Sequence, residues 1–80
     1  MTVAAISIPL GLLATGRTGL VKEAFAGRIL RQRLIDMGVA PGARVRVIRN
    51  EPNGPMIISI GEARLAIGRG MALKIMVEET

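Results

Sequence analysis

Residues 30–42 read Leu-Arg-Gln-Arg-Leu-Ile-Asp-Met-Gly-Val-Ala-Pro-Gly, and this stretch decides how the chain is organised. Leu30, Leu34 and Met37 follow one another at intervals of four and three residues. That spacing lines one face of an α-helix with apolar side chains. The stretch therefore predicts an amphipathic helix that begins after Gly27 and ends at Met37.

The end of the predicted helix carries residues that stop it. Gly38 can adopt the left-handed conformation that closes a helix, and Pro41 prevents the helix from resuming. Asp36 is expected to cap the helix, or to pair with Arg33 or with a strand backbone, rather than to act as an acid catalyst. Six residues are therefore expected to determine the fold, with Leu34 and Met37 in the core, Asp36 as a cap, Gly38 as the left-handed residue, Pro41 as the stop and Gly42 in the turn.

The side of the predicted helix opposite its apolar face is mostly polar. At about 100° per residue, that side carries Arg28, Arg31, Gln32 and Ile35, whereas Ile29 joins the apolar face. Ile35 either packs against a neighbouring loop or stands exposed as an apolar anchor in an arginine-lined contact patch. The sequence is compatible with both of these positions for Ile35.

Alternating apolar and polar residues on both sides of the helix predict β-strands. Residues 17–25 form the first, and Gly19 within it indicates a bulge or bend. Further strands are expected over residues 44–47, 56–60, 63–67 and 75–77, with tight hairpin turns, one helical turn at 71–74 and a solvated tail at 78–80. The chain is thus expected to be mainly β, with about five strands.

The length and composition favour a single domain over residues 1–80. Half of the residues are hydrophobic and only Phe25 is aromatic, so the core must consist of aliphatic side chains and methionine. The apolar stretch 3–14 has no preceding basic residue and is shorter than the roughly 20 residues that cross a bilayer. Neither a signal peptide nor a membrane span is expected there.

The chain contains no cysteine and no histidine, which excludes most catalytic chemistry. Disulfides, thiolate metal sites and cysteine nucleophiles are ruled out, and so are the commonest metal ligand and general base. Asp36, Glu51 and Glu62 are oxygen ligands, but they form no spaced metal-binding motif. We assign no catalytic residue and expect no enzyme.

The net charge of +5 comes mostly from arginine, which supplies nine of the eleven basic residues. Arginine pairs with carboxylate or phosphate through two parallel hydrogen bonds, so an anionic partner is one interpretation. The other is that scattered charges keep a small hydrophobic domain soluble. Single-strand nucleic-acid binders use aromatic rings for stacking, and those rings are nearly absent here.

Several positions taken together resemble a known family. They are Leu10, Leu13, Gly16, Gly19 and Val21, the helix-to-turn run over residues 30–42, Arg64-Leu65-Ala66-Ile67, and Ile75 with Val77-Glu78. This pattern, which covers residues 10–78, resembles ferrous iron transport protein A (FeoA) of bacteria and archaea. Its most specific part is R-L-x-D-M-G-x-x-P-G.

The resemblance implies a small SH3-like β-barrel with one inserted α-helix and a short C-terminal helical turn. It also implies a cytoplasmic regulatory protein that binds ferrous iron transport protein B, a permease with a GTP-binding domain, at the inner face of the membrane. No small-molecule substrate is implied. The contact residues are not fixed by the motif, so helix phase and charge alone suggest Arg28, Arg31, Ile35 and Arg46.

Two other functions stay open at the level of sequence. A basic SH3-like barrel can bind nucleic acid, and then its affinity would fall steeply with salt. A metal-binding regulator would have to hold Fe²⁺ or Zn²⁺ through oxygen ligands such as Asp36 and Glu51. We expect no resident cofactor, and weak homo-oligomers through a sheet edge remain an alternative.

Overall fold

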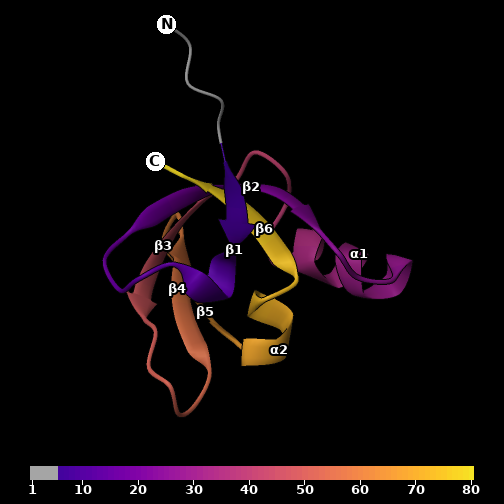
Figure 1. Ribbon diagram of the computed structural model, residues 1–80. Helices are drawn as coiled ribbons and strands as arrows, with labels where there is room; N and C mark the ends of the chain where they lie inside the picture. Colours follow the sequence, from indigo (N-terminus) through magenta and orange to yellow (C-terminus); the bar gives the residue numbers. More distant parts are fainter. Residues whose placement is uncertain (1–5) are drawn as a thin grey trace, which may run out of the picture.

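Six antiparallel strands and two short helices make up residues 6–80, the part of the chain that the computed structural model describes (Figure 1). The strands are β1 (Ser7–Pro9), β2 (Thr18–Ala24), β3 (Arg44–Arg49), β4 (Met56–Ile60), β5 (Ala63–Ile67) and β6 (Ile75–Glu79). The helices are α1 (Arg28–Asp36) and α2 (Arg69–Ala72), and a 3₁₀ turn, η1, spans Leu10–Leu12. The mainly β architecture and the inserted helix predicted from sequence are confirmed.

The strands form one sheet in the order β1-β6-β2-β3-β4-β5. Its two end strands, β1 and β5, are not paired with each other among the described residues, so the predicted barrel is open rather than closed. η1 and the end of α2 pack together, and a Cβ atom on Gly11 would come within 2.9 Å of Leu73 Cδ2. Glycine at position 11 therefore permits this close contact.

The core lies on the inner face of the sheet and is entirely hydrophobic. In β3, Val45 and Val47 point inward and are fully buried, whereas Arg44 and Arg46 point to solvent. This alternation follows from the two-residue period of a strand. The other buried members are Leu10, Leu13, Val21, Leu34, Val39, Met56, Ile58, Ile67, Ala72, Ile75 and Val77.

The bulge expected at Gly19 lies further along the strand. The register of β2 against β6 shifts between Val21 and Glu23. Gly19 serves another purpose, because a Cβ atom there would lie 3.3 Å from the Glu78 carbonyl oxygen and from Val77 Cβ. Glycine at position 19 allows β2 and β6 to approach closely.

The predicted apolar face of α1 is only partly buried. Among the helical residues, Leu34 alone is buried, at 2% exposure, whereas Ile29 is 75% exposed. The prediction that Met37 belongs to the core is wrong, since its side chain is 45% exposed. The reason is that α1 projects from one side of the curved sheet, so that one turn touches the core (Figure 1).

The end of α1 is built from backbone geometry rather than from a side-chain cap. Gly38 has φ +98° and Gly42 has φ +90°, in agreement with their predicted roles in ending the helix and turning the chain. Asp36 does not cap the helix, because its carboxylate accepts a hydrogen bond of 3.0 Å from Gln32 Nε2 one turn earlier. The free groups at a helix C-terminus are carbonyl oxygens, and a carboxylate has no hydrogen to donate to them, so Asp36 cannot cap this end.

Both ends of the described chain are more ordered than the sequence suggested. β1 was not predicted, and it pairs with β6. The expected solvated tail at 78–80 is wrong, since Glu78 and Glu79 belong to β6 and the Thr80 N–H donates to the Thr18 carbonyl. The apolar stretch 3–14 falls partly outside the described residues, and no helix within residues 6–80 is long and apolar enough to span a membrane.

Candidate partner-binding surfaces

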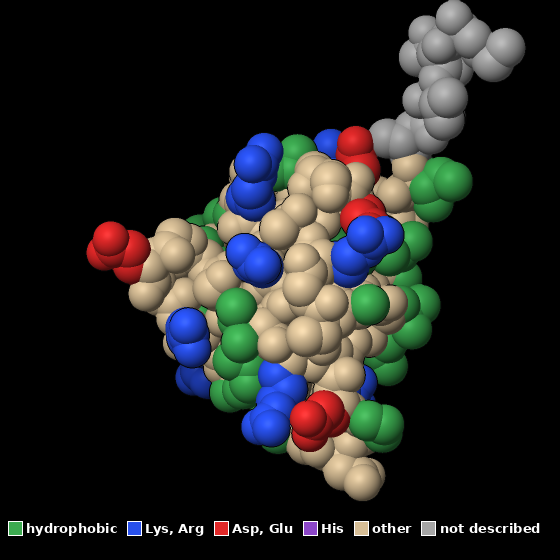
Figure 2. All heavy atoms as spheres, turned by 90° about the vertical axis from the view of Figure 1, so that its left-hand side faces the viewer, with side chains coloured by type: hydrophobic (Ala, Val, Ile, Leu, Met, Phe, Trp, Pro, Cys, Tyr) green, Lys and Arg blue, Asp and Glu red, His purple; other side chains and the backbone are tan. Residues whose placement is uncertain are grey.

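The outer face of the sheet carries a row of polar side chains that crosses three strands. Arg46 of β3 is the register partner of Ser59 of β4, and Ser59 is the partner of Arg64 of β5. Side chains in such a row point to the same side of the sheet. Figure 2 shows basic side chains spread across the face of the molecule that lies at the left of Figure 1, with exposed hydrophobic side chains between them.

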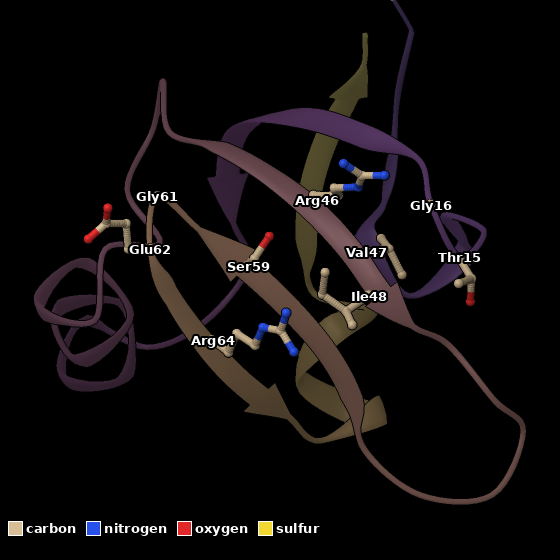
Figure 3. A pocket seen from close by; sticks show the side chains of 9 residues that line it. All are labelled: Thr15, Gly16, Arg46, Val47, Ile48, Ser59, Gly61, Glu62 and Arg64. Carbon is tan, nitrogen blue, oxygen red and sulfur yellow. The ribbon is translucent and has the colours of Figure 1, made fainter.

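This row borders an open hollow of about 610 Å³ (Figure 3). The remaining lining comes from the turn before β2, from β3 and from the β4–β5 turn, as Thr15, Gly16, Val47, Ile48, Gly61 and Glu62. In Figure 3, the Arg46 and Arg64 side chains stand on opposite sides of Ser59, and Glu62 lies at the far end. We name this feature the β-face hollow.

A second, smaller hollow of about 180 Å³ lies between β2 and α1. Arg31 and Ile35 line it from the helix, and Val21, Val39 and Pro41 are among the residues opposite. Ile35 is 44% exposed, so half of its surface is available to a partner. Ile35 is therefore accessible, and it borders the same hollow as Val39 and Pro41 in the loop that follows α1.

The structure divides the four predicted contact residues among three places. Arg31 and Ile35 share the small hollow, whereas Arg28 lines a shallow depression with Ile29 and Leu30 on another side of α1. Arg46 lies in the β-face hollow. Arg31 and Ile35 thus lie together, whereas Arg28 and Arg46 border other hollows, and the role of these four residues in partner binding stays a prediction.

Arg46 and Arg64 differ from several other basic residues in having no ionic partner. Within residues 6–80 the ion pairs are Arg17–Glu79 at 2.7 Å, Arg49–Glu51 at 3.1 Å and Lys22–Glu78 at 3.2 Å. No carboxylate of the described chain comes within 4.0 Å of the Arg46 or Arg64 guanidinium. Their charges are therefore available to a ligand.

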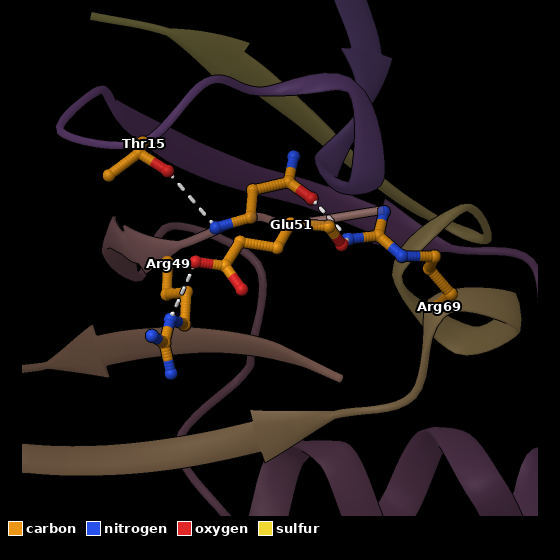
Figure 4. A network of polar contacts seen from close by, with 5 residues as sticks. Thr15, Arg49, Glu51 and Arg69 are labelled. Carbon is orange, nitrogen blue, oxygen red and sulfur yellow. Dashed lines mark hydrogen bonds and ion pairs between the residues drawn. The ribbon is translucent and has the colours of Figure 1, made fainter. Parts of the chain in front are cut away.

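A polar network fixes one border of the β-face hollow (Figure 4). The Asn50 backbone N–H donates to Thr15 Oγ1 at 3.0 Å, and its side-chain amide donates to the Gly11 and Leu13 carbonyls at 3.0 and 2.8 Å. Arg69 Nη2 donates to Asn50 Oδ1 and to the Glu51 carbonyl. Thr15, which lines the hollow, is held in place by this network.

The sequence analysis did not predict that Ser59 and Arg64 share a surface with Arg46. It also did not predict the hydrogen-bond network of Asn50 beside that surface. The alternation over 63–67 already placed Arg64 on the outer face, and the two-residue turn fixed its register with Ser59. The sequence of the β4–β5 hairpin therefore contained enough information to place Ser59 and Arg64 side by side on the outer face. The Asn50 network joins segments 19 to 39 residues apart and left no local pattern.

The carboxylates of the described chain do not converge. No three acidic side chains within residues 6–80 are grouped in a way that could hold a metal ion. Glu51 pairs with Arg49, and Asp36 accepts from Gln32 on the other side of the molecule. The oxygen-only metal site considered from the sequence has no set of ligands in this region.

Comparison with known proteins decides the family. The sequence model of the FeoA domain matches residues 8–79. The chain belongs to the FeoA family. A protein of Methanocaldococcus jannaschii named "Putative Fe(2+) transport protein A" is 48% identical over 71 residues, which is 89% of this chain and 85% of that protein.

Solved structures agree with this assignment. A crystal structure of an iron uptake regulatory protein, FeoA, superposes with a TM-score of 0.87 at 40% identity, over 94% of this chain and all of that one. FeoA of Stenotrophomonas maltophilia, described as an SH3 domain protein and crystallised with zinc, gives a TM-score of 0.75 at 23% identity over 92% and 91% of the two chains. The SH3-like fold and the link of this FeoA-family protein to ferrous iron transport are thereby established.

Proposed function

We propose that this FeoA-family protein is a cytoplasmic accessory protein of ferrous iron uptake that regulates the permease by binding to it. The permease is ferrous iron transport protein B, and the bound protein lies at the inner face of the membrane. The family supports a role in ferrous iron transport. A chain without cysteine or histidine supports a binding role rather than a catalytic one.

The observation that carries this proposal is the exposed apolar surface of α1 and its approach. Ile29 and Ile35 are 75% and 44% exposed, and Phe25, just before the helix, is 62% exposed. Large apolar side chains gathered on one exposed element are typical of a protein interaction site. Arg31 stands beside Ile35 in the same small hollow and adds a positive charge to it.

The proposal is tested by capture of the detergent-solubilised permease from the same organism, with and without guanine nucleotide. The wild-type protein is expected to retain the permease, and Ile35→Asp and Arg31→Glu are expected to weaken that retention at least about tenfold while the thermal midpoint stays the same. Leu12→Asp, the same kind of change at a 65% exposed position on η1, is the matched control. No capture in either nucleotide condition would overturn the proposal.

A nucleic-acid arm distinguishes the main alternative. RNA and DNA oligonucleotides are offered to the same immobilised protein at low and high salt. Binding of nucleic acid through phosphate contacts would be lost steeply as salt rises. Retention of the permease together with no nucleic-acid capture supports the accessory role, whereas the reverse result favours a nucleic-acid-binding protein.

A further inference from the structure

We propose that the β-face hollow binds an acidic polypeptide segment, whose carboxylates pair with Arg46 and Arg64. This surface is separate from the α1 surface in the proposal above and does not depend on it. The occupant is defined by its chemistry, as an extended stretch of protein chain that carries two carboxylates at a fixed spacing.

The positions of the two arginines come from strand register and not from flexible loops. Arg46 and Arg64 are each paired with Ser59 across one strand spacing, so two spacings separate their backbones. Neighbouring strands lie about 4.8 Å apart, which puts the two arginine Cα atoms about 10 Å from each other. Side chains at residues i and i+2 of an extended chain point to the same side and are about 7 Å apart, a separation that two long arginine side chains on Cα atoms about 10 Å apart can span.

The charges in the hollow favour an anion. Both guanidinium groups lack a carboxylate partner within the described chain, unlike those of Arg17 and Arg49. The Ser59 hydroxyl between them can donate to an incoming oxygen. A guanidinium binds a carboxylate through two parallel hydrogen bonds, which gives both affinity and orientation.

The rest of the lining favours a polypeptide over a nucleic acid. Ile48, which is half-buried, offers apolar contact to side chains of the ligand, and no aromatic ring lines the hollow for stacking with bases. Glu62 at the end of the hollow would repel the continuous negative charge of a phosphate backbone. A peptide can place its neutral residues there and its carboxylates on the two arginines.

The test uses the full chain, labelled with ¹⁵N, and a fluorescent probe peptide with three repeats of Glu-Ser-Glu-Gly, in which all the glutamates of an extended chain share one face. Saturable binding at low ionic strength is expected, with amide shifts concentrated at Arg46, Ser59 and Arg64. Arg46→Gln and Arg64→Gln should each weaken binding about three- to tenfold, the size expected for one partly exposed ion pair. Arg33→Gln on α1 removes the same charge outside the hollow and should change the affinity less than about twofold.

Several results would overturn the proposal. The first is an equal loss of affinity in Arg33→Gln, because the binding would then reflect net charge alone. Another is amide shifts on α1 rather than on the sheet, and a third is no saturation at low salt. A single-stranded RNA oligonucleotide that binds more tightly with the same amide shifts would assign the hollow to nucleic acid instead. None of these results bears on capture of the permease, so the two proposals fail separately.

Discussion

Arg69 at the start of α2 donates a hydrogen bond of 2.7 Å from Nη2 to Oδ1 of Asn50, which follows β3. Because the Asn50 amide also donates to two carbonyls near η1, one asparagine side chain joins three segments that are distant in the sequence. These segments follow β1, β3 and β5, so the network links the ends of the two edge strands to that of β3.

Replacement of Asn50 by alanine should therefore lower stability markedly. The change removes three side-chain hydrogen bonds and leaves partly buried carbonyls without a donor, which costs about 2 kcal/mol. For a domain of this size, that corresponds to a fall of about 8–16 °C in the thermal midpoint. Circular dichroism melting measures it.

Asn53→Ala provides the matched control for this measurement. Asn53 lies in the exposed turn between β3 and β4 and makes no side-chain hydrogen bond within the described chain. Its replacement should shift the midpoint by less than about 2 °C. If Asn50→Ala behaves like Asn53→Ala, the network does not contribute to stability as argued.

The central strands were predictable from the sequence because their alternating apolar and polar residues indicate which face of each strand is buried. In β3 the valines alternate with arginines, and in the β4–β5 hairpin the two-residue Gly61-Glu62 turn fixes the register. β1 was missed because a three-residue strand with Pro9 at its end has no readable alternation. Its pairing partner, β6, lies at the other end of the chain.

The candidate site was less predictable, and α1 shows why. Helical periodicity indicates which side chains share a face, but it does not indicate how much of that face the rest of the protein covers. Leu34 is buried and Met37 is not, although both belong to the same predicted face of the helix. The row of Arg46, Ser59 and Arg64 required the register of three strands, which only the fold brings together.

The difference between Leu34 and Met37 can be measured directly. Leu34 is 2% exposed, and truncation to alanine should cost about 3 kcal/mol through lost burial and a residual cavity. Met37 is 45% exposed, so Met37→Ala should cost less than about 1 kcal/mol. Urea titration of the two variants gives both values, and similar losses would show that Met37 belongs to the core after all.

Metal titration addresses the alternative of an iron or zinc regulator. We expect no stoichiometric, saturable binding of Zn²⁺ or Fe²⁺ by the described domain, because its carboxylates are dispersed. Weak uptake, if any, should be unchanged by Asp36→Asn and by Glu51→Gln. The titration is measured by calorimetry. Saturable binding of one ion per chain that is abolished by either variant would contradict this expectation.

Gly38 offers a test of how α1 is ended. Its φ of +98° is a left-handed conformation that alanine adopts only with strain, whereas an added Cβ would lie 3.6 Å from Ile60 Cγ2, an ordinary contact. The cost of Gly38→Ala should therefore be purely conformational, about 1–2 kcal/mol.

Gly70→Ala is the matched control, since Gly70 lies in α2 with φ in the usual range and open space around its Cα. Alanine there should leave stability unchanged or raise it by up to about 1 kcal/mol, because alanine is the better helix former. Equal losses for the two variants in urea titration would mean that the left-handed turn after α1 is not what makes glycine necessary at position 38.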